Sequence, residues 1–529
     1  MKFFAISAFA VSALWGQTPQ LEIKGIVVEA GTNQPISGAT ISLGRMRGTG
    51  TNNAVAYSVR GDLTTNAQGQ FRLQPDTAGL YTLSASKDGY VQAPTGVGTA
   101  AQIDAEHAVA EVRLYLARPG IIRGRLVDNN TGAPVVKQRV DINPFRFSKG
   151  HRMWLMGGFP TTDNEGRFGL ERLSPGDYLI SLPFPETKIQ PFHEGDLDQV
   201  DEGYERVYFP NGNDMDSGIP FHLASGATLD VGTLKSRRVP YYRVRVIIDS
   251  ANCTEGEMVR LDERRGPKGT IDYGAIGSVA CGSDLLLTGY QPGSYSLQAS
   301  ARSMTAISVF EIVNRNLEVR LTLGLGPDLQ GRVTTSEEIQ NVSAAGLRIQ
   351  AASLTGRQMD PVEKRPDVTG RFRLEHLQPD RIRLTVKDLP TGYYVKEIRY
   401  AGRAAEAGIF SWTGNGNVDV ILDNGPSTVT GSVRDGDRGV ESDVVLVKYP
   451  YYAGDIFESV THSSANADGT FVVPQLAPGE YRLIAVPVGL KNKIEEPFVL
   501  ERLILTAERL TLTPRASQFV TLRPIDPTR

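Results

Sequence analysis

A short pattern recurs along this chain and restricts its fold more than any other feature. In each copy an Asp or Asn is followed three residues later by Gly and five residues later by Phe. The four clear copies begin at residues 66, 163, 367 and 466, so their spacings are 97, 204 and 99 residues. The middle spacing is about twice the others, and a weaker copy lies inside it at Gly282–Leu287. The chain therefore predicts five tandem units of similar length.

Each copy holds the residues of two turns. The Asp or Asn side chain accepts backbone N–H bonds at the start of a type I turn, and Gly suits the end of that turn. The Phe then begins a strand of alternating apolar residues. A second turn follows, as at Leu173–Tyr178 and Leu476–Tyr481, where Pro-Gly predicts a type II turn. In the fourth unit Ile382 takes the place of the Tyr.

The remainder of each unit predicts further strands. Each unit opens with a strand and a polar turn, as at Ile23–Val28, and a β-branched strand such as Val444–Val447 follows. Gly accounts for 55 of 529 residues and Pro for 31, an excess that indicates many tight turns. Helical periodicity is nearly absent. About seven short strands in about 100 residues are typical of a Greek-key β-sandwich.

These motifs resemble the carboxypeptidase regulatory-like domain family, a transthyretin-like (prealbumin-like) β-sandwich. The resemblance implies an all-β fold, a tandem array of about five such sandwiches in a multi-repeat exported bacterial protein. In that family the sandwich accompanies a zinc peptidase or an outer-membrane barrel, or stands in arrays, and the repeats here leave no room for the first two. The expected boundaries are 1–16 for a signal peptide, then 21–118, 119–238, 239–325, 326–425 and 426–529 for repeats 1 to 5.

The N-terminus predicts export. One Lys precedes an apolar run from Phe3 to Trp15, which is shorter than the roughly 20 residues that a membrane-spanning helix needs. This arrangement is typical of a secretory signal peptide, with a cut between Gly16 and Gln17. We expect a periplasmic, cell-surface or extracellular protein without an integral membrane segment in its mature form.

Composition argues against several classes of function. With 56 Lys and Arg against 59 Asp and Glu, the net charge of −3 gives no reason to expect nucleic acid as a partner. None of the six His opens the spacing of a zinc peptidase, and no nucleophile elbow or phosphate loop is present. We expect no catalytic residues, no metal and no cofactor. The acidic stretch 194–216 is interpreted as a solvated interdomain loop, with Ca²⁺ binding as the alternative.

Cys253 and Cys281 are the two cysteines of the chain, and both lie in repeat 3. In an exported protein this pair predicts an intramolecular disulfide, with buried free thiols as the alternative. Closing a loop of this length stabilises by roughly 3 kcal/mol in the chain-entropy model.

The sequence favours an exported, non-catalytic scaffold or binding protein of the cell envelope or extracellular space. The alternatives are a carbohydrate-binding protein of a polysaccharide-handling system, since the superfamily includes starch-binding-like relatives, and an enzyme with an unrecognised site. Two aromatic stretches supply candidate ligand-binding residues: Trp154 and Phe159 in repeat 2, and Tyr451 and Tyr452 in repeat 5. Exposed aromatics stack on sugars or anchor protein interfaces. The alternative is that these rings cover a sandwich edge or fill an interdomain contact.

Overall fold

The computed structural model describes most of the chain after residue 20, and the expected signal peptide 1–16 lies outside the described residues. The described ranges are 21–45, 57–59, 63–93, 99–103, 108–183, 187–212, 214–249, 251–254, 256–265, 272–302, 304–336, 346–354, 361–452, 455–466 and 468–528.

Repeat 1 shows the plan that the other repeats follow. One sheet has the order β4-β1-β8-β6 and the other β3-β2-β5-β7. The opening strand β1 pairs antiparallel with β4, which carries the recurrent Phe, and parallel with β8, the last strand. The strands are β1 (Glu22–Glu29), β2 (Thr40–Arg45), β3 (Tyr57–Val59), β4 (Gln70–Leu73), β5 (Gly79–Ser86), β6 (Val91–Gln92), β7 (Thr99–Ile103) and β8 (Val109–Ala117).

Repeat 2 repeats this plan with the sheets β12-β9-β18 and β11-β10-β13-β16, and β17 also pairs with β13. Its strands are β9 (Gly120–Asp128), β10 (Asp141–Ser148), β11 (His151–Trp154), β12 (Arg167–Leu173), β13 (Gly176–Leu182), β16 (Val207–Tyr208), β17 (Phe221–Leu223) and β18 (Thr228–Ser236).

Repeat 3 contains β19 (Arg238–Asp249), β20 (Met258–Arg265), β21 (Asp272–Ala280), β22 (Asp284–Tyr290), β23 (Gly293–Ala301), β24 (Met304–Ile312) and β25 (Leu317–Thr322). Repeat 4 contains β26 (Leu329–Thr335), β27 (Arg348–Ser353), β28 (Val362–Lys364), β29 (Arg371–Leu374), β30 (Asp380–Lys387), β31 (Tyr393–Tyr400), β32 (Arg403–Ala404), the 3-10 turn η3 (Glu406–Gly408), β33 (Ile409–Trp412) and β34 (Asn417–Asn424). Both repeat the parallel pairing of first and last strands.

Repeat 5 adds helical turns to the same plan. Its elements are β35 (Ser427–Asp435), β36 (Arg438–Gly439), β37 (Ser442–Tyr449), η4 (Ile456–Ser459), β38 (Val460–Ala465), β39 (Thr470–Leu476), β40 (Gly479–Pro487), η5 (Val488–Glu495), α1 (Val499–Ile504), β41 (Glu508–Leu512) and β42 (Ser517–Leu522). Leu500 and Leu503 of the short helix α1 belong to the same buried cluster as Val445 and Val447 of β37, whose other face lies in the sandwich core, so this strand is buried on both faces. The continuous apolar run 444–447 is what such burial requires.

A glycine and a phenylalanine from two motifs form one packing unit. Gly25 lies opposite Phe71 in the pairing of β1 with β4, and Gly331 lies opposite Phe372 in repeat 4. A Cβ atom on either glycine would overlap the facing Phe ring. The aromatic ring therefore packs over a position that has no side chain. The same pairing joins Gly124 to Phe168 and Gly431 to Phe471.

The first predicted turn forms as expected. The Asp163 carboxylate accepts hydrogen bonds from the backbone N–H groups of Glu165 at 2.9 Å and Arg167 at 2.8 Å. Gly166 has a φ of 75°, in the left-handed region that favours glycine. The second turn differs in detail, because Gly176 has a φ of 146°, far from the value of about +80° for a type II turn.

The tyrosine after the second turn ties that turn to its own strand. The Tyr178 hydroxyl donates to the Ser174 carbonyl at 2.7 Å, and the Tyr481 hydroxyl donates to the Ala477 carbonyl at 2.7 Å. Repeat 4 lacks this tyrosine. There the buried Trp412 of β33 donates its indole N–H to the Leu377 carbonyl in the same turn, at 3.0 Å.

Two strands cross from repeat 2 into repeat 3. β14 (Ile189–Pro191) pairs with β22, and β15 (Asp201–Tyr204) pairs with β19. Between them lies the 3-10 turn η1 (Asp196–Asp198). The interpretation of residues 194–216 as an interdomain loop was therefore incomplete, because within this stretch β15 adds one strand to the next sandwich and β16 pairs with β13 of repeat 2.

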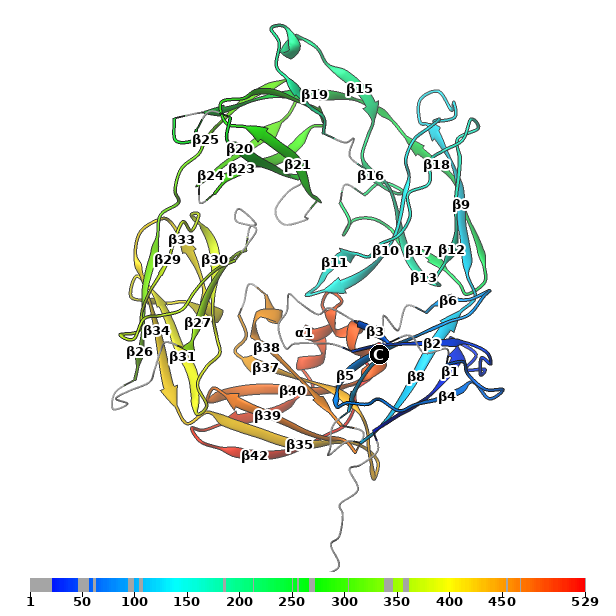
Figure 1. Cartoon of the computed structure of the whole chain (residues 1–529), viewed down its shortest axis with the longest axis vertical. Helices are drawn as coiled ribbons and strands as arrows, with labels where there is room; N and C mark the ends of the chain where they lie inside the picture. Colours follow the sequence, from blue (N-terminus) through cyan, green and yellow to red (C-terminus); the bar gives the residue numbers. More distant parts are fainter. Residues whose placement is uncertain are drawn as a thin grey trace, which may run out of the picture.

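The five sandwiches follow one another around a ring-like arrangement, with β11 and α1 drawn near its middle (Figure 1). Each repeat has a hydrophobic core of its own, and repeat 5 has a second core beneath η5 and α1. Contacts join successive repeats. The Ser174 hydroxyl of repeat 2 donates to the Gln92 carbonyl of repeat 1, and the Gln378 amide of repeat 4 donates to the Thr305 hydroxyl of repeat 3. The all-β array of sandwiches is confirmed.

Candidate binding surfaces

The first aromatic stretch forms a hairpin that extends from the sandwich of repeat 2. The second half of β10 pairs with β11 alone, and Lys149 and Gly150 turn the chain with φ values of 51° and 80°. The Phe145 and Phe147 rings meet edge to face at a centroid distance of 5.6 Å. The Arg152 guanidinium lies 4.8 Å from the centroid of the Phe145 ring. Aromatic and cationic groups thus stiffen this hairpin.

Apolar side chains are exposed at the base of the hairpin. The exposed fractions are 45% for Met153, 96% for Met156 and 50% for Phe159. The Arg139 guanidinium lies 4.0 Å from the centroid of the Phe159 ring. Trp154 pairs with Phe145 through its backbone in β11, and its side chain lies outside the described part of the structure.

The tip of the hairpin contacts repeat 5. The Gly150 N–H donates to the Glu495 carbonyl at 2.9 Å, and the Lys149 N–H donates to the Glu495 carboxylate at 2.6 Å. The Lys149 ammonium lies 3.3 Å from the Glu458 carboxylate. These contacts join residues more than 300 positions apart, and through them the hairpin connects repeat 2 to repeat 5.

Glu458 connects three repeats. Its carboxylate, on η4 of repeat 5, pairs with Lys149 of repeat 2 and with the Arg383 guanidinium of repeat 4. The Glu458 side chain is only 10% exposed. A nearly buried carboxylate with two cationic partners is the arrangement that offsets the cost of its desolvation.

The second aromatic stretch lies beside this junction. Tyr451 packs against the second core of repeat 5, and the Tyr452 hydroxyl accepts a hydrogen bond from the Arg381 guanidinium of repeat 4. Both rings are half-buried. These contacts favour the packing alternative for Tyr451 and Tyr452, whereas the exposure of Phe159 leaves its ring accessible to a partner.

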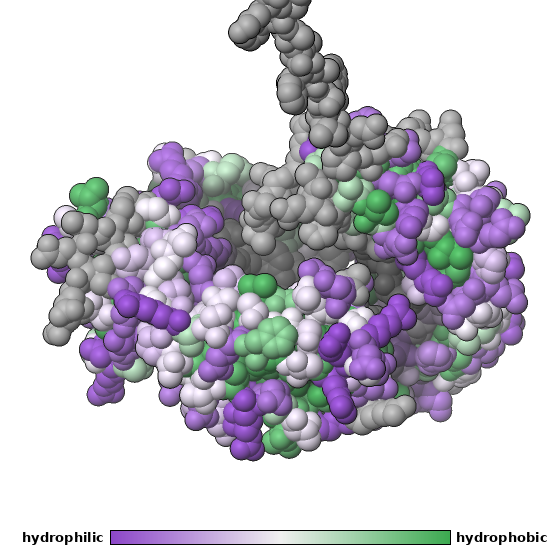
Figure 2. Space-filling view, turned by 90° about the horizontal axis from the view of Figure 1, so that it is seen from below, coloured by the Kyte–Doolittle hydropathy of each residue, from purple (hydrophilic) through white to green (hydrophobic). Residues whose placement is uncertain are grey.

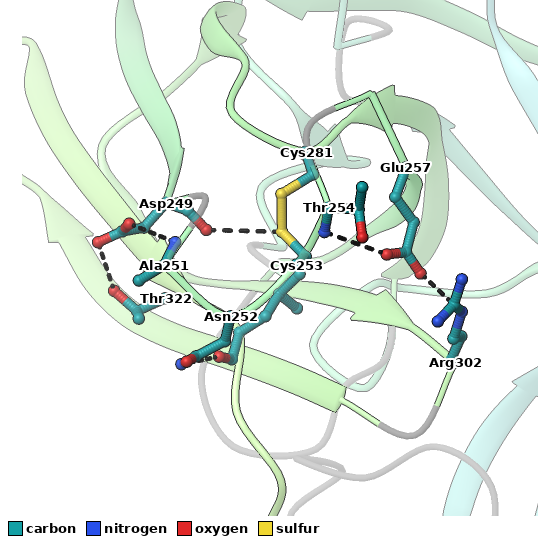
Figure 3. The surroundings of a disulfide bond; sticks show 10 residues. Asp249, Ala251, Asn252, Cys253, Thr254, Glu257, Cys281, Arg302 and Thr322 are labelled. Carbon is teal, nitrogen blue, oxygen red and sulfur yellow. Dashed lines mark hydrogen bonds and ion pairs between the residues drawn. A yellow bond between two sulfur atoms is a disulfide. The ribbon is translucent and has the colours of Figure 1, made fainter.

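The two cysteines lie together at one end of repeat 3 (Figure 3). Their sulfur atoms are joined, with Cα atoms 6.3 Å apart, a separation that suits a disulfide. Cys281 belongs to the core, and the segment around Cys253 is held by the Asn252 amide, which donates to the Leu323 carbonyl at 2.8 Å. The bridge would fasten this end of the sandwich.

The acidic side chains of the stretch 194–216 form ion pairs with different arginines. Asp201 pairs with Arg243 at 3.0 Å, and Glu205 pairs with Arg237 at 2.5 Å. Among the described residues, no three His, Cys, Asp or Glu side chains converge in a way that could hold a metal ion. The geometry therefore gives no support to Ca²⁺ binding here.

The lower outer edge of the ring, seen edge-on in Figure 2, includes apolar residues where the outer sheet of repeat 5 lies in Figure 1. Val472 of β39 and Phe519 of β42 both lie opposite Thr430 of the central strand β35. Their exposed fractions are 57% and 69%. The sequence analysis did not predict this surface. Val472 lies between the buried Phe471 and Val473, so it faces the side of the strand away from the core.

The fold and these surfaces define a tandem array of two-sheet β-sandwiches joined by side-chain contacts. Residues 22–111 match the family model described as the carboxypeptidase regulatory-like domain, so repeat 1 is of the type that the sequence motifs indicated. No curated protein matches the sequence. No helix in the described part of the chain is long and apolar enough to cross a bilayer.

Several solved structures are distantly similar. The Bacillus anthracis TIE protein is 13% identical over 57% of this chain and 50% of its own, with a TM-score of 0.16. The minor pilin GBS52 of Streptococcus agalactiae is 15% identical over 42% of this chain and 97% of its own, with a TM-score of 0.22. BcpA, the major pilin subunit of Bacillus cereus, is 10% identical over 77% of this chain and 99% of its own, with a TM-score of 0.15. At TM-scores this low, these likenesses carry no argument about function.

Proposed function

We propose that this chain is an exported, non-catalytic scaffold of the cell envelope or extracellular space. The observation that carries the proposal is the junction at Glu458, where one carboxylate joins repeats 2, 4 and 5. A chain of independent binding modules has no need of contacts between repeats that are distant in sequence. A scaffold gains from them, because they hold its surfaces in a fixed relation to one another.

Two measurements on the native protein test this proposal. Cell fractionation with N-terminal sequencing is expected to find the chain outside the cytoplasm, beginning near Gln17 after loss of residues 1–16. Small-angle scattering of the purified protein is expected to match one closed body. A cytoplasmic chain that retains Met1, or a scattering profile of flexibly linked beads, would contradict it.

A second candidate is ligand binding at the base of the repeat 2 hairpin, favoured by the half-exposed Phe159 ring. The partner is a polysaccharide or a protein, since either can bury an exposed aromatic ring. Phe159→Ala and Trp154→Ala are expected to abolish binding without lowering the melting temperature. Tyr451→Ala with Tyr452→Ala is the matched control, and it is expected to lower the melting temperature instead.

A further inference from the structure

The outer face of the sheet β39-β35-β42 in repeat 5 carries no charged side chain around its centre. Successive side chains of a strand point to opposite faces, so the residues beside the inward-facing pair Gly431 and Phe471 point outward. They form two rows across the three strands, all at least partly exposed. One row is Val472, Thr430 and Phe519, and the other is Thr470, Ser432 and Thr521. We call these six residues the neutral face.

The other four repeats carry charges at the equivalent positions. In each of them, four of the six residues that correspond to the neutral face are charged. In repeat 1 these residues are Lys24, Arg72, Glu111 and Arg113. The Lys24 ammonium pairs with the Glu111 carboxylate at 2.7 Å. In repeat 3, Arg245 pairs with Glu318 at 2.9 Å. The absence of charge is therefore a property of repeat 5.

Folding gives no reason for this difference, because the other repeats form the same sheet with charged side chains. The exposed fractions of 57% for Val472 and 69% for Phe519 leave apolar surface in contact with water. Within the described part of the chain, the hydroxyls of Ser432 and Thr521 have no hydrogen-bond partner. The Thr430 hydroxyl, in contrast, donates to the Gln518 carbonyl at 3.5 Å. The face thus offers apolar surface and hydroxyl groups to a partner.

The uncharged surface extends beyond the two rows in one direction only. Thr428 and Ser517 pair in the next row, and both are uncharged and at least partly exposed. In the other direction the exposed Arg434 and Arg523 follow two residues after Ser432 and Thr521. A partner that lies along the neutral face therefore contacts uncharged groups over three successive rows.

We propose that the neutral face binds an uncharged polysaccharide. A polymer with charged groups would find no opposite charge in these rows. The exposed Phe519 ring offers a flat apolar surface on which the C–H face of a sugar ring stacks. The Ser432 and Thr521 hydroxyls lie one row along, at about 7 Å, and each can donate and accept a hydrogen bond as sugar hydroxyls do.

The size of the neutral face disfavours a second copy of this chain as the partner. Three strands about 5 Å apart, each with about six residues at about 3.3 Å per residue, give an area of roughly 300 Å². A stable protein interface buries about 800 Å² on each partner. A polysaccharide needs only a few of its sugar rings in contact, and an area of this size accommodates them.

This site goes beyond the scaffold function and does not depend on the aromatic surface of repeat 2. The test is native affinity electrophoresis of the full-length mature protein in gels that each contain one neutral polymer: hydroxyethylcellulose, soluble starch, galactomannan or xyloglucan. Thr430→Lys with Phe519→Glu installs the ion pair that repeat 1 carries at the equivalent positions, so this variant is expected to fold. Gln330→Lys with Asn417→Glu is the matched control, because it creates the same pair at the equivalent positions of repeat 4.

At least one neutral polymer is expected to retard the wild type, and about 1 M salt is expected to leave the retardation unchanged, because screening acts on charges. The repeat 5 variant is expected to bind at least about tenfold more weakly, while the repeat 4 control binds as the wild type does. Phe519→Thr, which keeps the face uncharged but removes the ring, is expected to weaken binding as well. This second variant decides the question if the first one fails to fold.

The proposal is overturned if no polymer of the panel retards the wild type, or if the repeat 5 variant and the repeat 4 control bind alike. It is also overturned if salt abolishes the retardation, or if Phe159→Ala removes the same binding, since the site would then lie in repeat 2. Sedimentation of the wild type provides a further check. A dimer that Phe519→Thr dissociates would identify a second copy as the partner and would reject the polysaccharide.

Discussion

Repeats 3 and 4 solve the same packing problem with different residues. In repeat 4, Gly331 lies opposite Phe372, and the large ring fills the space over the glycine. In repeat 3, the equivalent cross-strand pair is Val246 with Leu285, and both side chains belong to the core. In repeat 4 the strand β29 supplies all the side-chain volume at this position, whereas in repeat 3 the strands β19 and β22 share it. The comparison teaches that the sandwich requires a filled core at this position, and that the Gly–Phe motif is one of two ways to fill it.

Repeat 3 also has supports that repeat 4 lacks. The pair Cys253 and Cys281 fastens one end of its sandwich, and the strands β14 and β15 extend one of its sheets. Ile189 of β14 packs against the core of repeat 3. Repeat 3, which lacks the recurrent turn residues, is thus the repeat that has a cysteine pair and two additional strands.

The largest expected effect comes from emptying the aromatic site of repeat 4. Phe372→Ala removes a buried ring over a position that has no side chain to collapse into the space, so we expect a loss of about 3–5 kcal/mol. Calorimetry of the full chain, with hydrogen exchange to locate the unfolding repeat, measures this loss. The matched change Leu285→Ala in repeat 3 is expected to cost less, because Val246 fills part of the space. Equal losses would contradict the volume argument.

The next effect tests the bridge of repeat 3. Cys253→Ser with Cys281→Ser is expected to lower the stability of that repeat by roughly 3 kcal/mol, because the loop between the two positions becomes free in the unfolded state. The unfolding transitions of the other repeats are expected to stay in place. Thiol titration of unfolded, non-reduced protein from an oxidising compartment is expected to find no free thiol. Two reactive thiols would show that the disulfide does not form.

A smaller effect tests whether the two packing solutions are interchangeable. Gly331→Val alone forces a side chain into the Phe372 ring and is expected to cost about 1–3 kcal/mol. Adding Phe372→Leu, which recreates the arrangement of repeat 3, is expected to restore part of this stability. A double-mutant cycle measures the coupling between the two positions. If the stability losses of Gly331→Val and Phe372→Leu simply add, the two side chains do not compete for the same space in the core.

The turns and the sandwich could be predicted because they depend on local residues. Asp163 and Gly166 bond within a few positions of one another, so their spacing carries the whole signal. The contacts between repeats could not be predicted, because Lys149 and Glu458 meet only after the array has closed.

The smallest effect concerns the tyrosine after the second turn, which repeat 4 replaces with Ile382. Burial raises the pKa of Tyr178, Tyr295 and Tyr481 to about 12 in repeats 2, 3 and 5. The fold therefore favours the neutral phenol of each ring. This contribution is fully present below the unfolded pKa of about 10, and it is lost as the pH rises from about 10 through about 12.

Repeat 4 is expected to resist alkaline conditions better than its neighbours, because the indole of Trp412 does not ionise in this range. Burial also raises the pKa of Tyr394 in this repeat, so we expect a reduced dependence on pH and not a complete loss of it. In mature protein that carries Trp154→Phe, Trp412 is the single tryptophan, and its fluorescence reports the unfolding of repeat 4. Calorimetry between pH 9 and pH 11.5 follows the other repeats in the same samples, and Tyr178→Phe is expected to flatten the pH dependence of repeat 2. If Trp412 fluorescence shows repeat 4 unfolding at lower pH than the rest, the tyrosines do not set the alkaline limit of these sandwiches.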